Sequence, residues 1–164
     1  MEFRKLTIAD KDQLDTLIST IEESLDNPEF WLPINEIARE HFFDDSWTNF
    51  YGLFDGSHLI AAAALFYNEH EYGESLSKLD IPSDAVAEIG RAMVHPDYRN
   101  SNLLLTITTK LLDIARAKGK EYVLATIHPQ NIPSQKSFTR LGMKKQCTYL
   151  KSSGFIRDIF IMKL

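Results

Sequence analysis

The sequence has few of the residues that cross-link a chain or anchor it in a membrane. Its 164 residues include one cysteine, Cys147, which excludes an internal disulfide and a zinc site built from several thiolates. The longest apolar run, residues 59–66, is far shorter than the ~20 residues that cross a bilayer. The amino terminus lacks the apolar segment and cleavage site of a signal peptide. We therefore expect a soluble, unprocessed cytoplasmic protein with no membrane partner.

Basic residues are also too few for an extended nucleic-acid interface. Lys and Arg number 18 against 23 Asp and Glu, so the formal net charge is −5, and a small-molecule or peptide partner is expected. The chain has 44% hydrophobic residues, no repeat and no linker. One compact domain over residues 1–164 is expected, because two separate cores would each be small. The sequence leaves both a monomer and a homodimer open.

The amino-terminal half predicts a strand, two helices and a hairpin. Residues 3–8 alternate as a strand, and Asp10 then caps a helix with apolar residues at helical spacing. A shorter helix is expected over residues 33–41, with Ile37 on its apolar side. Asp55-Gly56 suits the left-handed geometry of a tight turn. The apolar segments that this turn is predicted to pair are residues 50–54 and 59–67.

The carboxy-terminal half repeats a strand-helix unit and closes with an antiparallel pair. Before it, residues 68–84 are rich in charged and small polar side chains, and a long loop or a partly ordered insertion is expected there. Gly119 and Gly142 end the two predicted helices. The elements together predict an α/β (α+β) fold, a mixed sheet flanked by helices. They are strands 85–94 and 122–127, helices that begin near Leu104 and Pro133, and paired strands 144–150 and 155–164.

The stretch over residues 94–104, Val-His-Pro-Asp-Tyr-Arg-Asn-Ser-Asn-Leu-Leu, is placed to bind an anion. Such a site needs several backbone N–H groups aimed at one point, with a helix amino terminus behind them. A loop between a buried strand and a helix supplies both. The alternative is a strand-helix connector that binds no ligand.

This stretch resembles the acyl-CoA loop of the GNAT superfamily of N-acetyltransferases. The family pattern is Gln or Arg, two residues, Gly, one residue, then Gly or Ala. Arg99 matches the first position, whereas Asn102 and Leu104 replace small residues. Asn tolerates the left-handed region better than other non-glycine residues, so Asn102 is expected to keep the loop geometry. Leu104 is expected to turn into the core as a helical residue.

Residues 131–143 resemble the second signature of that family: Asn, two residues, a small residue, three residues, Tyr, three residues, Gly, Phe. The two signatures stand in the family order, one helix and one strand apart. The resemblance implies a mostly antiparallel central sheet of about seven strands flanked by about four helices. Three positions match as they stand and two aromatic positions carry other apolar residues: Asn131, Ser134 and Gly142, then Phe138 and Met143.

The resemblance implies that acetyl-CoA is the co-substrate. In the family, its pantetheine arm inserts where the strand before the loop separates from its neighbour. Asn131 is implied to contact this arm or the phosphates, and it also suits a helix N-cap. The implied acetyl-CoA contacts are Met93, Val94, His95, Arg99, Asn100, Ser101, Asn102, Leu103, Leu104, Asn131, Ser134 and Phe138.

Glu88 is the predicted catalytic residue. It lies on the strand that leads to the loop, where some family members carry a glutamate that takes the proton of the amine. Burial in a cleft would bring its pKa towards the working pH, as a general base requires. The structural alternative is a strand-end carboxylate paired with Arg91 or Arg116.

No general acid stands at the usual position, because Phe138 replaces the family tyrosine and a phenyl ring donates no proton. Either the thiolate leaves without a dedicated acid or another donor serves. His95 and His128 each precede a proline and have no third ligand at metal spacing, so we interpret them as strand-exit residues and expect no metal. The other available donors are Tyr149, Ser137 and Cys147.

Substrate recognition is expected in residues 27–45, residues 68–84 and the last hairpin. Their acidic side chains would attract an amine, although a charged run is usually a solvated face. Arg157, among apolar neighbours on the last strand, could receive a substrate carboxylate or merely stabilise the hairpin. The other candidates are Trp31, His41, Phe42, Phe43, Asp44, Asp45, Glu69, Glu71 and Glu74.

The leading hypothesis is therefore an enzyme that transfers an acetyl group from acetyl-CoA to a primary amine of a small molecule, amino acid or peptide by direct attack. The missing loop glycines and the missing tyrosine leave a second hypothesis, a catalytically inactive acyl-CoA-binding or regulatory domain. A protein-interaction module without a cofactor is the third.

Overall fold

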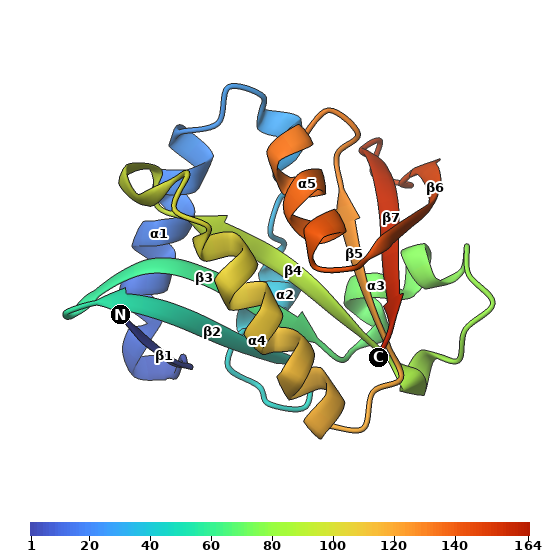
Figure 1. Cartoon of the computed structure of the whole chain (residues 1–164), viewed down its shortest axis with the longest axis horizontal. Coiled ribbons are helices and arrows are strands. Elements are labelled where there is room, and N and C mark those ends of the chain that lie inside the picture. Colours follow the sequence, from blue (N-terminus) through green and yellow to red (C-terminus); the bar gives the residue numbers. More distant parts are fainter.

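The computed structural model describes all 164 residues and contains one seven-stranded sheet (Figure 1). The strand order is β1-β2-β3-β4-β5-β7-β6, and every neighbouring pair is antiparallel except β4 with β5. The predicted mixed, mostly antiparallel sheet is thereby confirmed. The strands are β1 Glu2–Lys5, β2 Thr48–Asp55, β3 His58–Phe66, β4 Val86–Val94, β5 Tyr122–Ile127, β6 Lys144–Leu150 and β7 Ile156–Lys163.

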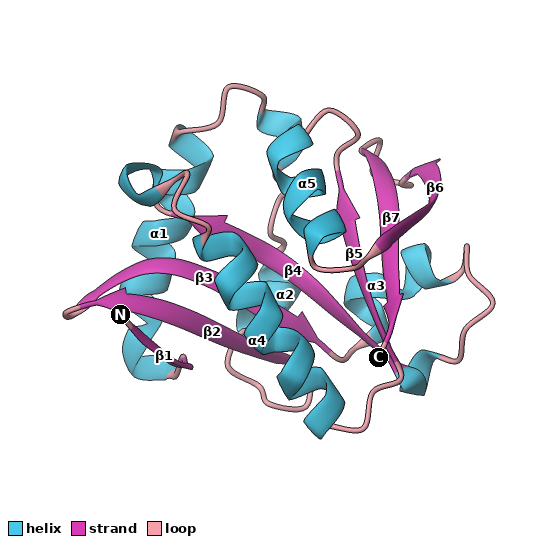
Figure 2. Ribbon diagram, in the orientation of Figure 1, coloured by secondary structure: helices cyan, strands magenta, loops and turns pink.

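Five helices cover the two faces of this sheet, one more than expected (Figure 2). The core clusters show that α4 and α5 pack on one face, whereas α1, α2 and α3 pack on the other. None of the helices has the length and apolarity of a membrane span. Their bounds are α1 Lys11–Glu23, α2 Glu36–Glu40, α3 Glu69–Leu76, α4 Leu103–Ala117 and α5 Ile132–Arg140.

The central strand β3 is buried on both faces. Ala61 and Ala63 join the core beneath α4, and Ala62 and Ala64 join the core beneath α1, as the two-residue period of a strand requires. Methyl side chains leave room for a helix to approach the sheet closely on each face. This double burial explains why the segment is a continuous apolar run.

The sequence located most elements, and the hairpin around Gly56, whose φ is +59°, is confirmed. Of the two alternatives for residues 68–84, the structure fits the partly ordered insertion, because α3 forms there. Asn68 caps α3 by accepting a hydrogen bond from the His70 amide at 2.8 Å, and Tyr72 and Leu76, one turn apart, are buried. Ile37 was also placed wrongly: it is 52% exposed on the one-turn helix α2.

The only parallel pair of strands separates part-way along its length. β4 pairs with β5 only from Val86 to Glu88, although both strands continue. Against β3, the register of β4 slips by one residue between Gly90 and Met93, and Arg91 in this bulge has a φ of +50°. The bulge turns β4 away from β5 and opens the sheet beyond Glu88.

Substitution of Gly90 tests the packing beside this opening. An added Cβ would lie 2.7 Å from the ring of Phe66. We predict that Gly90→Ala lowers the free energy of unfolding by about 1–3 kcal/mol, because the ring must move in a packed core. Gly73→Ala is the control: its Cβ would meet nothing closer than 3.6 Å within α3. That change should raise stability by about 0.5–1 kcal/mol. Urea unfolding measures both, and equal effects would contradict the packing described.

Candidate active site

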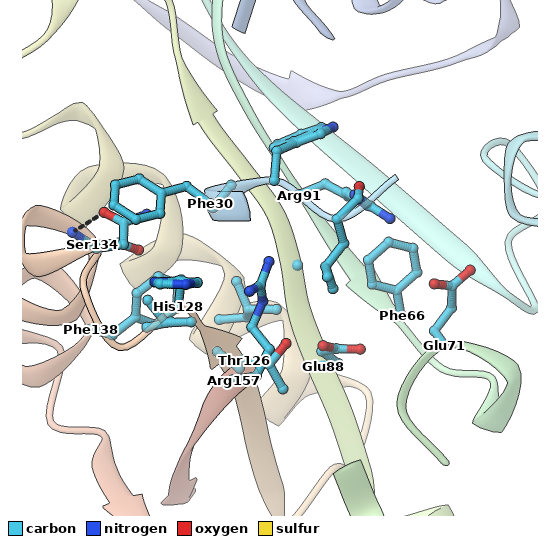
Figure 3. A pocket seen from close by; sticks show the side chains of 18 of the residues that line it. Phe30, Phe66, Glu71, Glu88, Arg91, Thr126, His128, Ser134, Phe138 and Arg157 are labelled. Carbon is cyan, nitrogen blue, oxygen red and sulfur yellow. Dashed lines mark hydrogen bonds between the residues drawn. The ribbon is translucent and has the colours of Figure 1, made fainter. Parts of the chain in front are cut away.

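A cavity of about 130 Å³ lies where β4 and β5 diverge (Figure 3). Charged side chains from three elements and one turn reach it: Glu88 and Arg91 from β4, Glu71 from α3, Arg157 from β7, and Lys151 from the turn after β6. Phe30 and Trp31, from the connection between α1 and α2, form its roof. We call this space the acceptor cavity.

Glu88 is a buried carboxyl at the floor of the acceptor cavity, with 8% of its surface exposed. Burial raises its pKa to about 8, and the negative charge of Glu71 contributes; Lys151, Arg91 and the Thr126 hydroxyl oppose the shift. None of the salt bridges involves Glu88, and Arg116 instead pairs with Asp113 at 2.8 Å. The pKa of Glu88 therefore lies well above the usual range of a carboxyl, and Glu88 forms no salt bridge.

Glu71 stands beside Glu88 because α3 packs against the same face of the sheet. Figure 3 shows both carboxyl groups on the side of the cavity away from His128, with Glu71 beside the ring of Phe66 and Glu88 below it. One oxygen of Glu71, Oε1, is buried without a hydrogen-bond partner. A buried acceptor without a donor costs free energy, so this end of the cavity is suited to a bound donor such as an ammonium group.

Arg91 extends from the bulge to the roof of the cavity. Its guanidinium donates hydrogen bonds to the carbonyls of Leu32 and Pro33, the latter at 3.3 Å. It also lies 5.2 Å from the centre of the Trp31 ring. The strained backbone of Arg91 is thus tied to the segment that closes the site.

A second, larger cavity of about 480 Å³ adjoins the first and runs along the loop after β4. The two cavities share Phe30, Trp31, Ala92, Asn131 and Ser134. We call this second space the cofactor cleft. Ten of the twelve acetyl-CoA contacts implied by the sequence line it: Met93, Val94, Arg99, Asn100, Ser101, Asn102, Leu103, Leu104, Asn131 and Ser134.

The two remaining residues lie elsewhere. Phe138 is 3% exposed and lines the acceptor cavity. His95 lines neither cavity; its side chain accepts a hydrogen bond from the Asp97 amide at 3.3 Å and faces a hollow beside α1. The geometry therefore does not bring the His95 side chain to the cofactor cleft.

The loop at the cofactor cleft contains no glycine, and asparagine residues adopt its left-handed backbone conformations. Asn102 has φ +59° and ψ +14°, the left-handed geometry expected of it, and Asn100 has φ +62°. The expectation for Leu104 was wrong by one position: Leu103 is buried in the core, whereas Leu104 is half-buried and lines the cleft.

The donors in the cofactor cleft suit the phosphates and the pantetheine arm of acetyl-CoA. Arg99, Lys136 and Arg140 supply positive charge, and α4 begins at the loop and directs its amino terminus into the cleft. Arg140 also donates to the side chain of Asn102 at 3.2 Å. Beyond Glu88, β4 has no partner strand on its β5 side, so its backbone groups are available to an amide-containing ligand.

The sequence model of the Acetyltransferase (GNAT) family matches residues 16–143. The chain belongs to this family. It is therefore an acetyl-CoA-dependent N-acetyltransferase, and members of the family act on amines of small molecules or peptides. No curated protein sequence matches the chain.

Solved structures of GNAT proteins share the fold. An N-acetyltransferase from Staphylococcus aureus Mu50 aligns with a TM-score of 0.74 at 16% identity, over 99% of this chain and 96% of its own. The protein yncA from Salmonella typhimurium, solved with its cofactor acetyl-CoA, has a TM-score of 0.75 at 15% identity, over 100% and 94%. The ribosomal-protein-S18-alanine N-acetyltransferase from Escherichia coli has a TM-score of 0.71 at 14% identity, over 99% and 92%.

In this acetyltransferase, the alternative proton donors are spread over the molecule. Ser137 lines the cofactor cleft, but its hydroxyl donates to the Pro133 carbonyl at 3.1 Å. Tyr149 is buried and shares a 2.6 Å hydrogen bond with Ser75, and Lys151 donates to it at 3.1 Å. Cys147 lines neither cavity. The three candidate donors therefore lie in different places, and Ser137 and Tyr149 already form hydrogen bonds within the protein.

The sequence identified His128 as a strand-exit residue but did not indicate that it lines the acceptor cavity, where it is 5% exposed. Its Nδ1 accepts from the Gln130 amide at 3.1 Å, and Nε2 lies 3.4 Å from a carboxylate oxygen of Glu29. These contacts indicate the tautomer with the proton on Nε2. The available signal was its position directly after β5, because ligands bind at the carboxyl ends of adjacent parallel strands.

Of the acidic and aromatic residues expected to recognise the substrate, Trp31 and Glu71 line the acceptor cavity. The others are used in packing or in surface contacts. His41 stacks on Trp47 at 3.7 Å, Asp45 pairs with Lys5, and Glu74 accepts from the Ser152 amide at 2.6 Å. Most of the acidic run is thus unrelated to the cavity.

Asn102 provides a test of the loop. We predict that Asn102→Gly keeps the affinity for CoA within about threefold, because glycine adopts a positive φ without strain. Asn102→Val should weaken CoA binding about tenfold, since a β-branched residue is strongly disfavoured there. Titration calorimetry with CoA measures both variants. Equal affinities for Gly and Val would show that the loop does not depend on the left-handed residue.

Proposed function

We propose that this GNAT protein transfers the acetyl group of acetyl-CoA to a primary amine of a small molecule, amino acid or peptide by direct attack. The observation that carries the proposal is Glu88, a buried carboxyl without a salt bridge in a cavity that adjoins the cofactor cleft. Residues 1–164 act in this proposal as one domain, because both core clusters pack on the same sheet.

Glu88 acts as the general base in this scheme. The attacking nitrogen must lose a proton, and a carboxylate at the floor of the acceptor cavity is positioned to receive it directly or through one water. Trp31, Phe66 and Phe138 enclose the cavity and limit its access to solvent. This enclosure produces the raised pKa on which the role depends.

The other proposed roles fall to the cofactor cleft. Acetyl-CoA supplies the thioester whose acetyl group is transferred. Arg99, Lys136 and Arg140 would hold its phosphates with the amides at the start of α4. The backbone of β4 from Ile89 to Val94, which is unpaired on its β5 side, would hold the pantetheine arm. Asn131 caps α5, accepting from the Ser134 amide at 3.4 Å, and lines both cavities.

Proton return to the thiolate has no assigned donor. Phe138 contributes packing in the acceptor cavity and no proton. A thiol has an ordinary pKa of about 8.5, so a thiolate leaves more easily than most groups in acyl transfer. We propose that it departs without a dedicated side-chain acid.

The pKa of Glu88 predicts a pH profile. Because the pKa is raised to about 8, the carboxylate forms only as the pH rises through this value, and kcat/KM should rise between pH 6.5 and 9. Glu88→Gln should lower kcat about 10²- to 10⁴-fold and remove the rise near pH 8, leaving only the titration of the amine itself. Thiol release from acetyl-CoA measures both.

CoA affinity is the control for that variant, since Gln keeps the shape of Glu88 and should change the dissociation constant less than about threefold. A wild-type profile without a rise near pH 8, or full activity of Glu88→Gln, would remove Glu88 from the role. No turnover with any amine despite CoA binding would contradict the proposed function itself.

Arg99 gives an independent test of the cofactor cleft. Its guanidinium donates to the Ser24 hydroxyl at 2.6 Å and has no carboxylate partner. We predict that Arg99→Ala weakens CoA binding about tenfold and that added salt diminishes the difference. Arg39→Ala, on α2 and paired with Asp15 at 2.8 Å, is the matched control. An unchanged CoA dissociation constant in Arg99→Ala would refute the phosphate contact.

A further inference from the structure

Arg157 is a buried cation without an anionic partner. It is 2% exposed and lines the acceptor cavity. None of the salt bridges involves it. A charge removed from water costs several kcal/mol unless an opposite charge compensates for it. A buried guanidinium of this kind is therefore suited to a ligand that brings the missing charge.

The contacts of Arg157 with the protein use only part of its donors. One nitrogen, Nη1, donates to the Ile156 carbonyl at 2.7 Å, and Nη2 donates to the Glu29 carbonyl at 2.7 Å. A guanidinium has five N–H groups in a planar fork, so three remain free. The two hydrogen bonds to carbonyls explain where the Arg157 side chain lies. They do not explain why the residue is charged, because a neutral side-chain amide could donate the same hydrogen bonds.

A second guanidinium faces the same space. Arg91 has no salt bridge either, and its hydrogen bonds also go to backbone carbonyls. Burial lowers the pKa of Arg157, and the positive charge of Arg91 lowers it further, so the two side chains repel each other. Lys151, by contrast, is already paired with Glu74 at 3.8 Å. Neither guanidinium forms a salt bridge, although the negative charges of Glu71 and Glu88 act on Arg91. Two neighbouring guanidinium groups of this kind are suited to bind a carboxylate.

The opposite charge lies at the other end of the cavity. Glu71 and Glu88 lie together there, and Figure 3 shows the guanidinium of Arg157 between them and His128. The cavity therefore offers acceptors for an ammonium group at one end and free guanidinium donors near its middle. At about 130 Å³ it is smaller than the roughly 300–1,000 Å³ of pockets for drug-sized ligands.

We propose that the acceptor is a small free amino acid, whose carboxylate binds the guanidinium groups of Arg157 and Arg91 while its amine lies at Glu88. This inference rests on the proposed acetyl transfer and names its substrate class. The amine nitrogen forms a bond to the acetyl carbon as the thioester C–S bond breaks. The bound ammonium first gives one proton to Glu88, which leaves a neutral nucleophile. The nitrogen releases its second proton to solvent as the amide forms, and the thiolate leaves with the electron pair of the C–S bond.

The test compares small amino acids with their carboxamides and with the corresponding decarboxylated amines, using thiol release from acetyl-CoA. The wild type should favour the free acid over the amide by about 10- to 100-fold in kcat/KM. Arg157→Gln should abolish this preference by lowering kcat/KM for the free acid to the level of the amide. Arg157→Lys keeps the charge but loses the fork, and should restore part of the preference.

Two controls separate binding from folding. Arg116→Gln, on the surface of α4, removes one charge far from the cavity and should keep the wild-type preference. Unchanged melting temperature and CoA affinity of Arg157→Gln would show that the roof segment is intact. Calorimetry of wild-type protein with CoA and either the amino acid or its amide gives the same comparison without a variant, and tighter binding of the acid is expected.

Three outcomes would overturn the inference. Equal kcat/KM for acid and amide in the wild type, or a preference retained by Arg157→Gln, would show that Arg157 only supports the roof. A preference for peptides over free amino acids would refute the substrate class. In all three cases turnover persists, whereas failure of the proposed function would appear as no thiol release with any amine of the panel.

Discussion

The separation of β4 from β5 determines where every candidate group in this protein lies. The two strands pair only as far as Glu88 and Leu124, and the bulge at Arg91 then directs β4 away while β3 continues to hold its other edge. Glu88 is the last residue of β4 that pairs with β5, so its carboxyl lies at the floor of the opening. The loop before α4 borders one side of the gap, and the start of α5 borders the other.

The bulge has a cost that nearby contacts offset. A non-glycine residue at a φ of +50° is strained by about 1–2 kcal/mol. The side chain of Arg91 compensates through its hydrogen bonds to Leu32 and Pro33 and through its contact with Trp31. Arg157 from β7 holds the carbonyl of Glu29 in the same segment. The opening and its roof thus depend on the same arginines that face the acceptor cavity.

Local patterns in the sequence were sufficient for most of the fold and for much of the cofactor cleft. Asn102 could be assigned a left-handed conformation because this preference belongs to the residue itself. His95 could not be placed from its position in the loop, since its side chain turns towards α1. The sequence also named Glu71 and Arg157 as candidates for substrate recognition but could not place them near Glu88. Glu71 reaches it because part of residues 68–84 folds into α3, and Arg157 is 69 residues further along the chain.

Burial of Glu88 links folding to the proposed chemistry. An ammonium group gives its proton to an ordinary glutamate of pKa 4.5 at a free-energy cost of about 1.4 kcal/mol for each unit by which its own pKa exceeds 4.5. A glutamate pKa of about 8 lowers the cost of the same transfer by about 5 kcal/mol.

The difference of about 5 kcal/mol comes from removing the carboxyl from water, and it must act against folding. A pKa raised in the folded state means that the folded protein holds its proton more tightly, so this contribution to stability falls as the pH rises from about 4.5 to 8. An ammonium group bound between Glu71 and Glu88 would supply the positive charge that their burial lacks. While it is bound, the acceptor would therefore reduce the electrostatic cost of burying Glu88, which is the same cost that raises its pKa.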